Sequence, residues 1–243
     1  MSCSARLPIY VLFADMFFGK NAMLVAYSLY IIGIFVAILV AFVADRLHPT
    51  KEENALLIEL PEYKTPNGHT IAIYVWEKVK DYLTKAGTTI FIASIILWFL
   101  LNYNSHGMVA DVAESFGAAI GHLAVPILAP AGLGMWQIAV ALLCGISAKE
   151  VVVSSFSVLF GIANINSAAG MAELSGVLGQ NGFTALNAYC LMLFCLLYVP
   201  CVATIGTIRR ETRSWKWTFG MIAFQLLLAW SVSALVFQIG SLF

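Results

Sequence analysis

Charged residues are scarce in this chain. Asp, Glu, Lys and Arg make up 11% of its 243 residues, against about 25% in an average soluble protein. The 13 basic and 13 acidic residues balance, so the chain has no basic surplus with which to bind nucleic acid. It also lacks the G-x-x-x-x-G-K-S/T motif of P-loop proteins and the G-x-S-x-G and H-E-x-x-H motifs of hydrolases. We therefore expect no nucleic-acid partner and no enzymatic activity in this chain.

Cysteine is present, but not in a metal-binding pattern. None of the five cysteines forms a C-x-x-C pair, which argues against a disulfide framework and against a structural zinc site. The four histidines lie outside the clear apolar runs and have no ligand spacing to one another. We interpret them as solvated side chains and expect no permanently bound cofactor.

Hydrophobic residues dominate the composition of the chain. Hydrophobic residues make up 61% of the chain, and the mean hydropathy is +0.89. These values predict an all-α, polytopic membrane protein. Runs of the length needed to cross a bilayer lie at residues 21–44, 87–103, 136–161, 183–208 and 215–240.

Other segments predict irregular or surface structure. Residues 7–18 are apolar but too short to span, and they read as half of a broken helix. Residues 116–133 contain two prolines and fit a re-entrant or surface segment. Residues 70–85 alternate apolar and charged faces at helical spacing, which predicts an amphipathic interfacial helix. Residues 162–182 are small and polar, and we expect a loop there.

The run at residues 136–161 contains two charges, the adjacent Lys149 and Glu150. A charge near the centre of a membrane span costs at least about 2.5 kcal/mol. A charged pair at this depth therefore predicts a functional site.

The distribution of Lys and Arg predicts which loops face the cytoplasm. Residues 45–85 hold six of these cations and residues 209–216 hold four, so both should be cytoplasmic. Residues 102–135 and 162–182 hold none, so both should be external. The region 116–161 must then cross the membrane an even number of times. Either its proline-containing half crosses, or its Lys-Glu half is a hairpin or a broken helix.

A polar stripe accompanies the charged pair. On one continuous helix, Glu150 shares a face with Ser147, Ser154 and Ser157, and Lys149 points elsewhere. One carboxylate and three hydroxyls on one face suit a cation path, which these residues would line. The alternative is that the small serines permit close packing between helices.

A second constellation is the segment YVPCVATIGTIRRE at residues 198–211. Pro200 has no N–H to donate, so we expect the carbonyl of Leu196 to be free for another partner. Cys201 follows the proline directly, and Thr204 lies one turn later. A thiolate beside free backbone oxygens suits a borderline transition metal. The alternative is an ordinary proline kink with a buried thiol.

The N-terminal segment repeats part of this pattern. Cys3 begins the triplet Cys-Ser-Ala, as Cys201 begins Cys-Val-Ala. Cysteines at the starts of two half-helices are typical of a transporter built from repeats. We therefore count Cys3 with Cys201 and Glu150 as candidate metal ligands, and count Lys149, Thr204 and the three serines as lining the path.

Several blocks resemble the C-terminal membrane region of the FeoB ferrous iron transporters. They occur in that family's order and cover nearly the whole chain. The resemblance implies gate-type broken or re-entrant helices, and in the family the cysteine of the second gate's proline-cysteine motif, here Cys201, is proposed to line the iron path. The blocks are SCSARLPIYVLFADMFF, ELPEYKTP, WEKVKDYLTKAGT followed by ASIILWFL, GISAKEVVVSS, YVPCVATIGTIRRE and SWKWTFGMIAFQLLLAW.

The resemblance also implies a domain order. Residues 1–20 resemble the tail of a first gate domain, residues 20–68 a middle region, and residues 69–243 a second gate domain. Family members also carry a GTPase domain and the rest of the first gate, which have no counterpart here. The chain is then either a fragment or the product of a split gene, and any use of GTP belongs to the other portion.

These features predict the membrane permease part of a ferrous iron uptake transporter in the bacterial inner membrane. Fe(II) is the transported substrate. The expected partners are the lipid bilayer, the GTPase and first-gate portion in cis or on another chain, and further copies of the chain in a homo-oligomer. Two alternatives stay open: a non-transporting assembly subunit, and a gate-type transporter of an organic solute such as a nucleoside.

Overall fold

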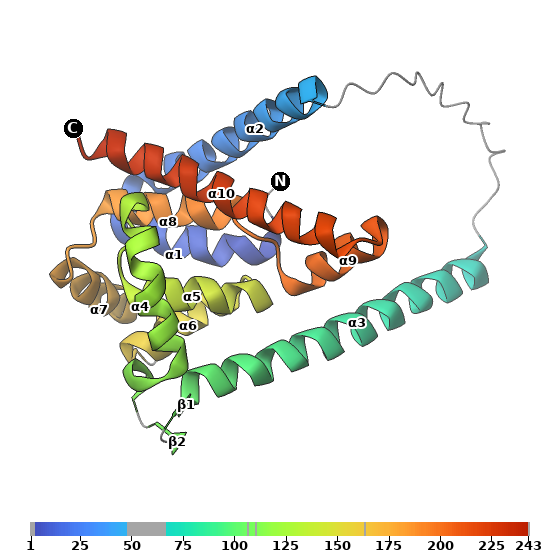
Figure 1. Ribbon diagram of the computed structural model, residues 1–243, viewed down its shortest axis with the longest axis horizontal. Coiled ribbons are helices and arrows are strands. Elements are labelled where there is room, and N and C mark those ends of the chain that lie inside the picture. Colours follow the sequence, from blue (N-terminus) through green and yellow to red (C-terminus); the bar gives the residue numbers. More distant parts are fainter. Residues whose placement is uncertain (1–2, 48–66, 106, 110, 163, 243) are drawn as a thin grey trace.

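A computed structural model describes residues 3–47, 67–105, 107–109, 111–162 and 164–242, with the side chains at 4, 47, 81–82, 85–90 and 93–94 left out. The described chain is almost entirely helical, with one short antiparallel hairpin (Figure 1). The elements are η1 Ser4–Arg6, α1 Leu7–Phe18, η2 Gly19–Asn21, α2 Ala22–Leu47, α3 Gly68–Asn102, β1 Tyr103–Asn104, β2 Gly107–Met108, η3 Val112–Glu114, α4 Phe116–Leu128, η4 Ala129–Ala131, α5 Trp136–Ser147, α6 Val151–Phe160, α7 Ala168–Gln180, α8 Ala185–Leu197, α9 Val202–Thr212 and α10 Trp215–Gly240.

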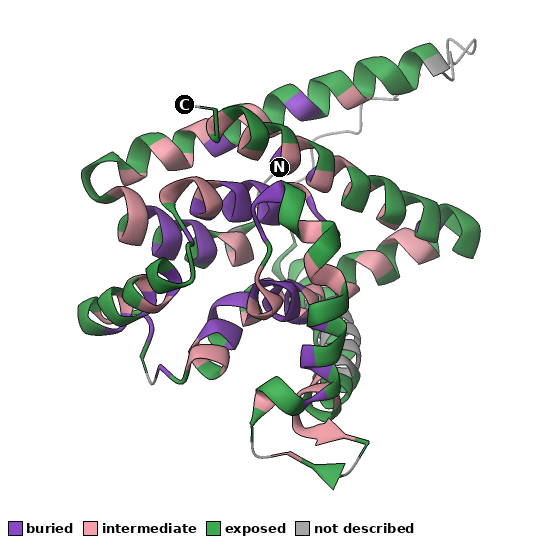
Figure 2. Cartoon of the chain, turned by 60° about the vertical axis from the view of Figure 1, so that its left-hand side comes forward, coloured by how far each residue is buried: buried purple, intermediate pink, exposed green. Residues whose placement is uncertain are grey.

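Long helices frame a centre of short ones. In Figure 1, α2, α3 and α10 lie on the outside, and α1, α5, α6 and α8 lie between them. Helix α8 packs against α10, α1 and α2, and α5 packs against α4 and α6. Figure 2 shows the same division by burial, because the outer helices are mostly exposed and the short central ones are buried. An apolar helix with exposed sides is what a bilayer permits, since lipid replaces protein as its neighbour.

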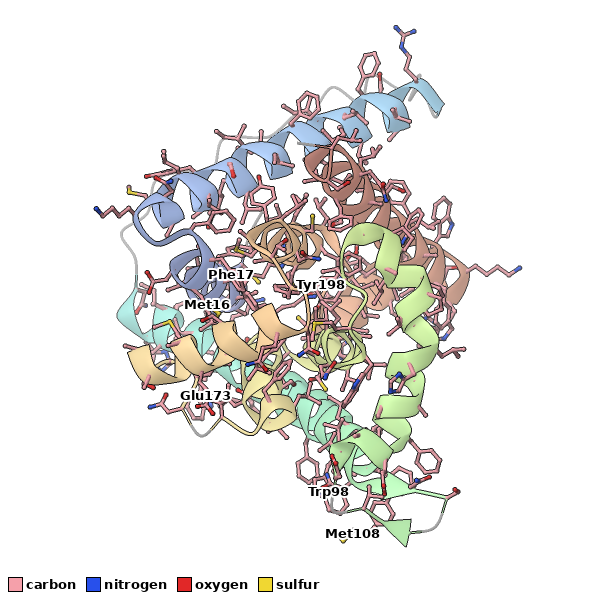
Figure 3. The ribbon with its side chains drawn as sticks, turned by 90° about the vertical axis from the view of Figure 1, so that its left-hand side faces the viewer. Met16, Phe17, Trp98, Met108, Glu173 and Tyr198 are labelled. Carbon is pink, nitrogen blue, oxygen red and sulfur yellow. The ribbon has the colours of Figure 1, made fainter. Side chains whose placement is uncertain are left out.

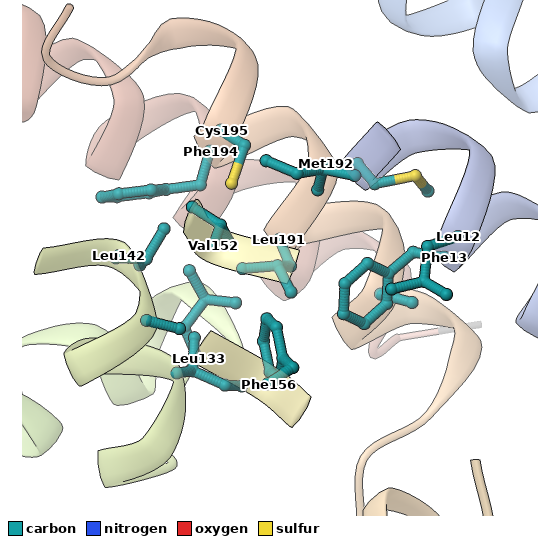
Figure 4. Packing of buried hydrophobic residues seen from close by; sticks show 14 of the residues in the cluster. Leu12, Phe13, Leu133, Leu142, Val152, Phe156, Leu191, Met192, Phe194 and Cys195 are labelled. Atoms are coloured by element: carbon teal, nitrogen blue, oxygen red, sulfur yellow. The ribbon is translucent and has the colours of Figure 1, made fainter. Parts of the chain in front are cut away.

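The core joins α1, α6 and α8. The ring centroid of Phe13 lies 5.3 Å from that of Phe156, edge to face. Leu191 and Met192 from α8 are fully buried beside them (Figure 4). Edge-to-face aromatic pairs contribute about 0.5–1.5 kcal/mol beyond the area they bury. Helix α8 is thus the element around which the short helices are assembled.

The predicted membrane class is confirmed. Within the described residues, three stretches are long and apolar enough to cross a bilayer: Leu7–Arg46, Ala185–Thr212 and Trp215–Gly240. A further pair, Phe116–Ala131 and Trp136–Ser147, is bent by 100°, as in a broken span or a re-entrant loop. The break lies directly after the proline-containing segment, between Ala131 and Trp136, whereas Pro126 lies inside α4; the bent pair agrees with the re-entrant character expected there.

Two expectations need correction. The run 136–161 is not one continuous helix, because α5 ends at Ser147 and α6 begins at Val151; the broken-helix alternative holds. Residues 162–182 were expected to be a loop but include α7, which begins at the N-cap Ser167, whose hydroxyl accepts from the N–H of Gly170. The small and polar residues of this segment indicated a loop, but they form a capped helix.

The expected interfacial helix and the span after it form one element. Helix α3 runs without interruption for 35 residues, about 50 Å at about 1.5 Å per residue. Asn67 caps its start by accepting from the N–H of His69. No boundary separates residues 70–85 from 87–103, and the positions of both parts relative to the bilayer remain predictions.

Candidate functional site

Interrupted helices meet in the interior. One break separates α5 from α6 at residues 148–150, and another separates α8 from α9 at residues 198–201. Tyr198, from the second break, lies in the middle of the molecule (Figure 3). Lys149, from the first break, contacts the second. This junction is the candidate site.

Lys149 joins the two breaks. Its side chain is 2% exposed. Its Nζ donates a hydrogen bond of 2.5 Å to the carbonyl oxygen of Val199 and lies 3.1 Å from the ring centroid of Tyr198. A buried ammonium is costly unless it is paired, and a carbonyl oxygen and an aromatic face both attract a cation. The charge is therefore tolerated because the second break supplies its partners.

Proline explains why the second break is open. Pro200 cannot donate a backbone hydrogen bond and disfavours helical backbone at the residue before it. Tyr198 ends α8 with ψ 176° and Cys201 caps α9 with ψ 159°, both extended. The carbonyl that receives a side-chain donor is that of Val199, three residues beyond the Leu196 carbonyl expected from the proline.

A glycine lets the second break approach α5. A Cβ on Gly145 would overlap the hydroxyl oxygen of Tyr198 and Cγ2 of Val152. The same hydroxyl donates a hydrogen bond of 3.4 Å to the carbonyl of Leu142, one turn earlier in α5. The ring that faces Lys149 is thus seated against the bare backbone of α5.

Cys201 stands at the first turn of α9. Its side chain is half-buried, and its sulfur lies 3.4 Å from Oγ1 of Thr204. Cys201 and Thr204, both predicted to line a path, are thus neighbours in space.

The N-terminal cysteine belongs to the same neighbourhood. Lys149 interacts electrostatically with Cys3, Cys195 and Cys201, and also with Arg6. Cys3 is exposed and precedes η1, which leads into α1. Nε of Arg6 is buried and, among the described residues, has no hydrogen-bond partner. Arg6 and Cys3 thus lie within electrostatic reach of the Lys149 junction, and the pairing of Cys3 with Cys201 as metal ligands stays a prediction.

The predicted polar stripe is not formed as a helical face. The break after Ser147 separates it from Glu150, which is exposed at the start of α6. Ser147 is buried and donates to the carbonyl of Cys144 at 2.7 Å. Ser154 is exposed and Ser157 half-buried. The prediction that all four side chains share one face assumed a continuous helix. Because the helix is broken at residues 148–150, that prediction is wrong.

Some of these serines still share a space. A pocket of about 220 Å³ lies between α3 and the α5–α6 pair. Ser147 and Ser154 line it, together with Cys144, Trp98 and other mostly apolar residues; Glu150 and Ser157 do not. Among the described residues, no group of three or more His, Cys, Asp or Glu side chains is placed to hold a metal ion.

Sequence reasoning missed the partners of Lys149. Tyr198 lies in the YVPC block, but the sequence offered no reason to expect that it, Arg6 or Cys195 would interact with Lys149. The available signal was an aromatic residue two positions before a membrane proline, in a chain that also buries a lysine. No sequence signal indicated that the two breaks would meet.

Comparison of the sequence with known proteins identifies the family. Residues 26–78 match the family model "Ferrous iron transport protein B C terminus", and residues 83–215 match the gate model, described as "Nucleoside recognition". The Fe(2+) transporter FeoB of Staphylococcus aureus (strain COL) is 41% identical over 243 residues, with 100% of this chain and 35% of the relative covered. No solved structure matches.

More distant relatives agree. The Fe(2+) transporter FeoB of Methanocaldococcus jannaschii is 36% identical, with 100% of this chain and 36% of the relative covered. The Fe(2+) transport protein A/Fe(2+) transporter FeoB fusion protein of Porphyromonas gingivalis is 34% identical, with 100% and 34% covered. The chain thus spans about a third of the length of these relatives. By its gate and C-terminal matches, the chain belongs to the FeoB family, as part of its membrane region.

Proposed function

We propose that this chain forms part of the path by which Fe(II) crosses the bacterial inner membrane. The observation that carries the proposal is the junction of two broken helices, where Lys149 binds the carbonyl of Val199 and Cys201 follows two residues later at the start of α9. Transporters place cation sites at interrupted helices, where unwound backbone replaces the water of the ion. The names of the similar proteins, Fe(2+) transporters, support the same substrate.

Cys201 is the proposed sulfur ligand. Thr204 adds a hydroxyl 3.4 Å from that sulfur, and Cys3 approaches from the start of α1. Exposed Glu150 offers an anionic carboxylate to a cation entering the junction. Sulfur with oxygen suits Fe(II), but such ligands bind later divalent metals more tightly, so selectivity has to come from geometry.

The transport cycle needs a further portion. We infer that GTP hydrolysis and the rest of the first gate are supplied in cis or by another chain, because the matched residues correspond to the C-terminal membrane region. In this arrangement residues 1–20 end the first gate, residues 20–68 form the middle region, and residues 69–243 form the second gate. Assembly into a homo-oligomer is part of the same proposal.

Uptake measurements test the role of the ligands. Cys201→Ser and Glu150→Ala are each expected to lower the initial rate of Fe(II) uptake by the complete transporter in cells by about tenfold, because losing even a supporting residue of a metal site costs 10–100-fold in affinity or activity. Cys190→Ser, in buried α8, and Glu173→Ala, exposed on α7, are the matched controls. Uptake at the control rate in both test variants removes Cys201 and Glu150 from the path.

One observation favours a second candidate, an organic solute. The gate model that matches residues 83–215 is described as "Nucleoside recognition". The pocket beside α5, of about 220 Å³, is smaller than the roughly 300–1,000 Å³ of a usual small-molecule site, which argues against a nucleoside there. Binding of radiolabelled nucleosides and of Fe(II) to the purified chain separates the two. Metal binding only in the presence of the GTPase-bearing portion favours the assembly-subunit alternative.

A further inference from the structure

The proposal above uses Lys149 to mark the junction but assigns no task to its buried charge. It is the one charged side chain classed as buried among those that the structure describes. We infer that its ammonium is a tethered cation that fills a cation seat at the α8–α9 break, formed by the carbonyl of Val199 and the ring of Tyr198. A transported cation then reaches Cys201 and the Val199 carbonyl only when Lys149 has left. This inference rests on the proposed function and adds a device that closes the path.

The seat is built from groups that attract cations. Nζ lies 2.5 Å from the Val199 oxygen and 3.1 Å from the Tyr198 centroid. Carbonyl oxygens are the groups with which ion channels replace the water around a cation. An aromatic face attracts the same charge. The ammonium therefore occupies the place that a desolvated metal ion would prefer.

A metal ion bound to Cys201 and the ammonium of Lys149 in the seat cannot be present at the same time. Cys201 follows Val199 by two positions and interacts electrostatically with Nζ. A divalent ion bound to both the sulfur and the Val199 oxygen would lie within a few ångströms of the ammonium, where like charges repel strongly in a medium of low dielectric constant. Binding of metal and retention of Lys149 in the seat are thus mutually exclusive.

The position of Lys149 allows it to leave. It lies in the short link between α5 and α6, directly after Ala148, whose backbone is extended with φ −150° and ψ 137°. A lysine side chain is a flexible four-carbon stem with a compact charge. The next residue, Glu150, is exposed and offers an anionic partner outside the seat.

Thiol labelling of Cys201 tests the charge without requiring iron transport. The experiment uses the complete transporter in membrane vesicles, with Cys3→Ser and with thiols outside this chain replaced by serine. Cys144, Cys190 and Cys195 are buried, so Cys201 is the thiol to be labelled, and Cys201→Ser gives the background. The measured quantity is the rate with a cationic methanethiosulfonate divided by the rate with a neutral one of similar size.

Lys149→Gln is expected to raise this ratio by about tenfold. This is the effect of removing the repulsion between the ammonium and a cationic reagent about 10 Å away, at an effective dielectric constant of about 20. Lys149→Arg, which keeps the charge, should leave the ratio unchanged. A general loosening of the structure raises both rates together and leaves the ratio where it was. If the glutamine variant does not fold, Lys149→Met carries the same comparison.

Protection by Mn(II), a stable stand-in for Fe(II), tests occupancy of the seat. Half-protection of Cys201 from the neutral reagent is expected at about tenfold lower Mn(II) in Lys149→Gln than in the parent, since metal no longer competes with the ammonium. An unchanged ratio or an unchanged protection concentration overturns the inference. A changed ratio with normal uptake in Cys201→Ser instead refutes the transport proposal and leaves the seat standing.

Discussion

Replacing Gly145 with alanine tests whether the α8–α9 break is seated against α5 as described. The added Cβ would overlap the hydroxyl of Tyr198 and Cγ2 of Val152. Overpacking of this kind costs about 1–3 kcal/mol, and moving the ring away from Lys149 loses a further 0.5–2 kcal/mol, roughly, of cation–π attraction. Alanine recovers about 1 kcal/mol through its higher helix propensity. The net expectation is a loss of about 0.5–4 kcal/mol.

The assay is unfolding of the purified protein by SDS in mixed micelles, which gives a free energy of unfolding. Gly206→Ala is the matched control, because Gly206 also lies inside a helix but a Cβ there meets nothing within 4 Å. The control should stabilise the protein by about 0.5–1 kcal/mol.

A double-mutant cycle identifies the cause of the loss. Tyr198→Phe removes the oxygen that the new methyl group meets and keeps the ring over Lys149. Combined with Gly145→Ala, it should recover at least about 1 kcal/mol, within the range measured for residues in contact. If the two changes are additive within about 0.5 kcal/mol, or if Gly145→Ala is as well tolerated as Gly206→Ala, the close approach of Tyr198 to α5 is refuted.

Two further predictions concern the packing of α10 and α2 on the rest of the fold. Gly132 has φ +74°, and a Cβ there would overlap the Phe237 ring, whereas Gly161 has φ +69° and open space around it. Gly132→Ala should therefore destabilise the protein by about 1–3 kcal/mol more than Gly161→Ala in the same SDS assay. Equal losses would contradict the packing of α10 on η4. Ser28 shares a 2.9 Å hydrogen bond with Tyr189, which ties α2 to α8. Ser28→Ala should cost about 0.6 kcal/mol, the average for such bonds in membranes, and the effect should vanish when Tyr189 is already phenylalanine.

Hydropathy predicted most of the long elements. The expected runs 21–44 and 215–240 correspond to α2 Ala22–Leu47 and α10 Trp215–Gly240. The half-helix expected at 7–18 is α1 Leu7–Phe18. Such elements are predictable because lipid forces an apolar surface and internal backbone bonding on each spanning helix by itself.

The site was less predictable, because it depends on contacts between distant segments. Proline at position 200 correctly indicated an interruption, yet nothing local in residues 145–150 distinguishes a broken helix from a continuous one. The break there is stabilised by Val199 and Tyr198, about fifty residues away along the chain. Tertiary partners of this kind override local propensity. The prediction of a polar stripe joining Glu150 to Ser147 was wrong for this reason.

X-ray absorption at the iron edge tests the central claim most directly. The complete transporter carrying Cys3→Ser, loaded with Fe(II) under anaerobic conditions, is expected to show an iron–sulfur scattering path that disappears when Cys201→Ser is added and persists when Cys190→Ser is added. Iron surrounded only by oxygen and nitrogen in the unaltered protein, or an iron–sulfur path that survives Cys201→Ser, contradicts the assignment of Cys201 as a ligand on the route of the ion.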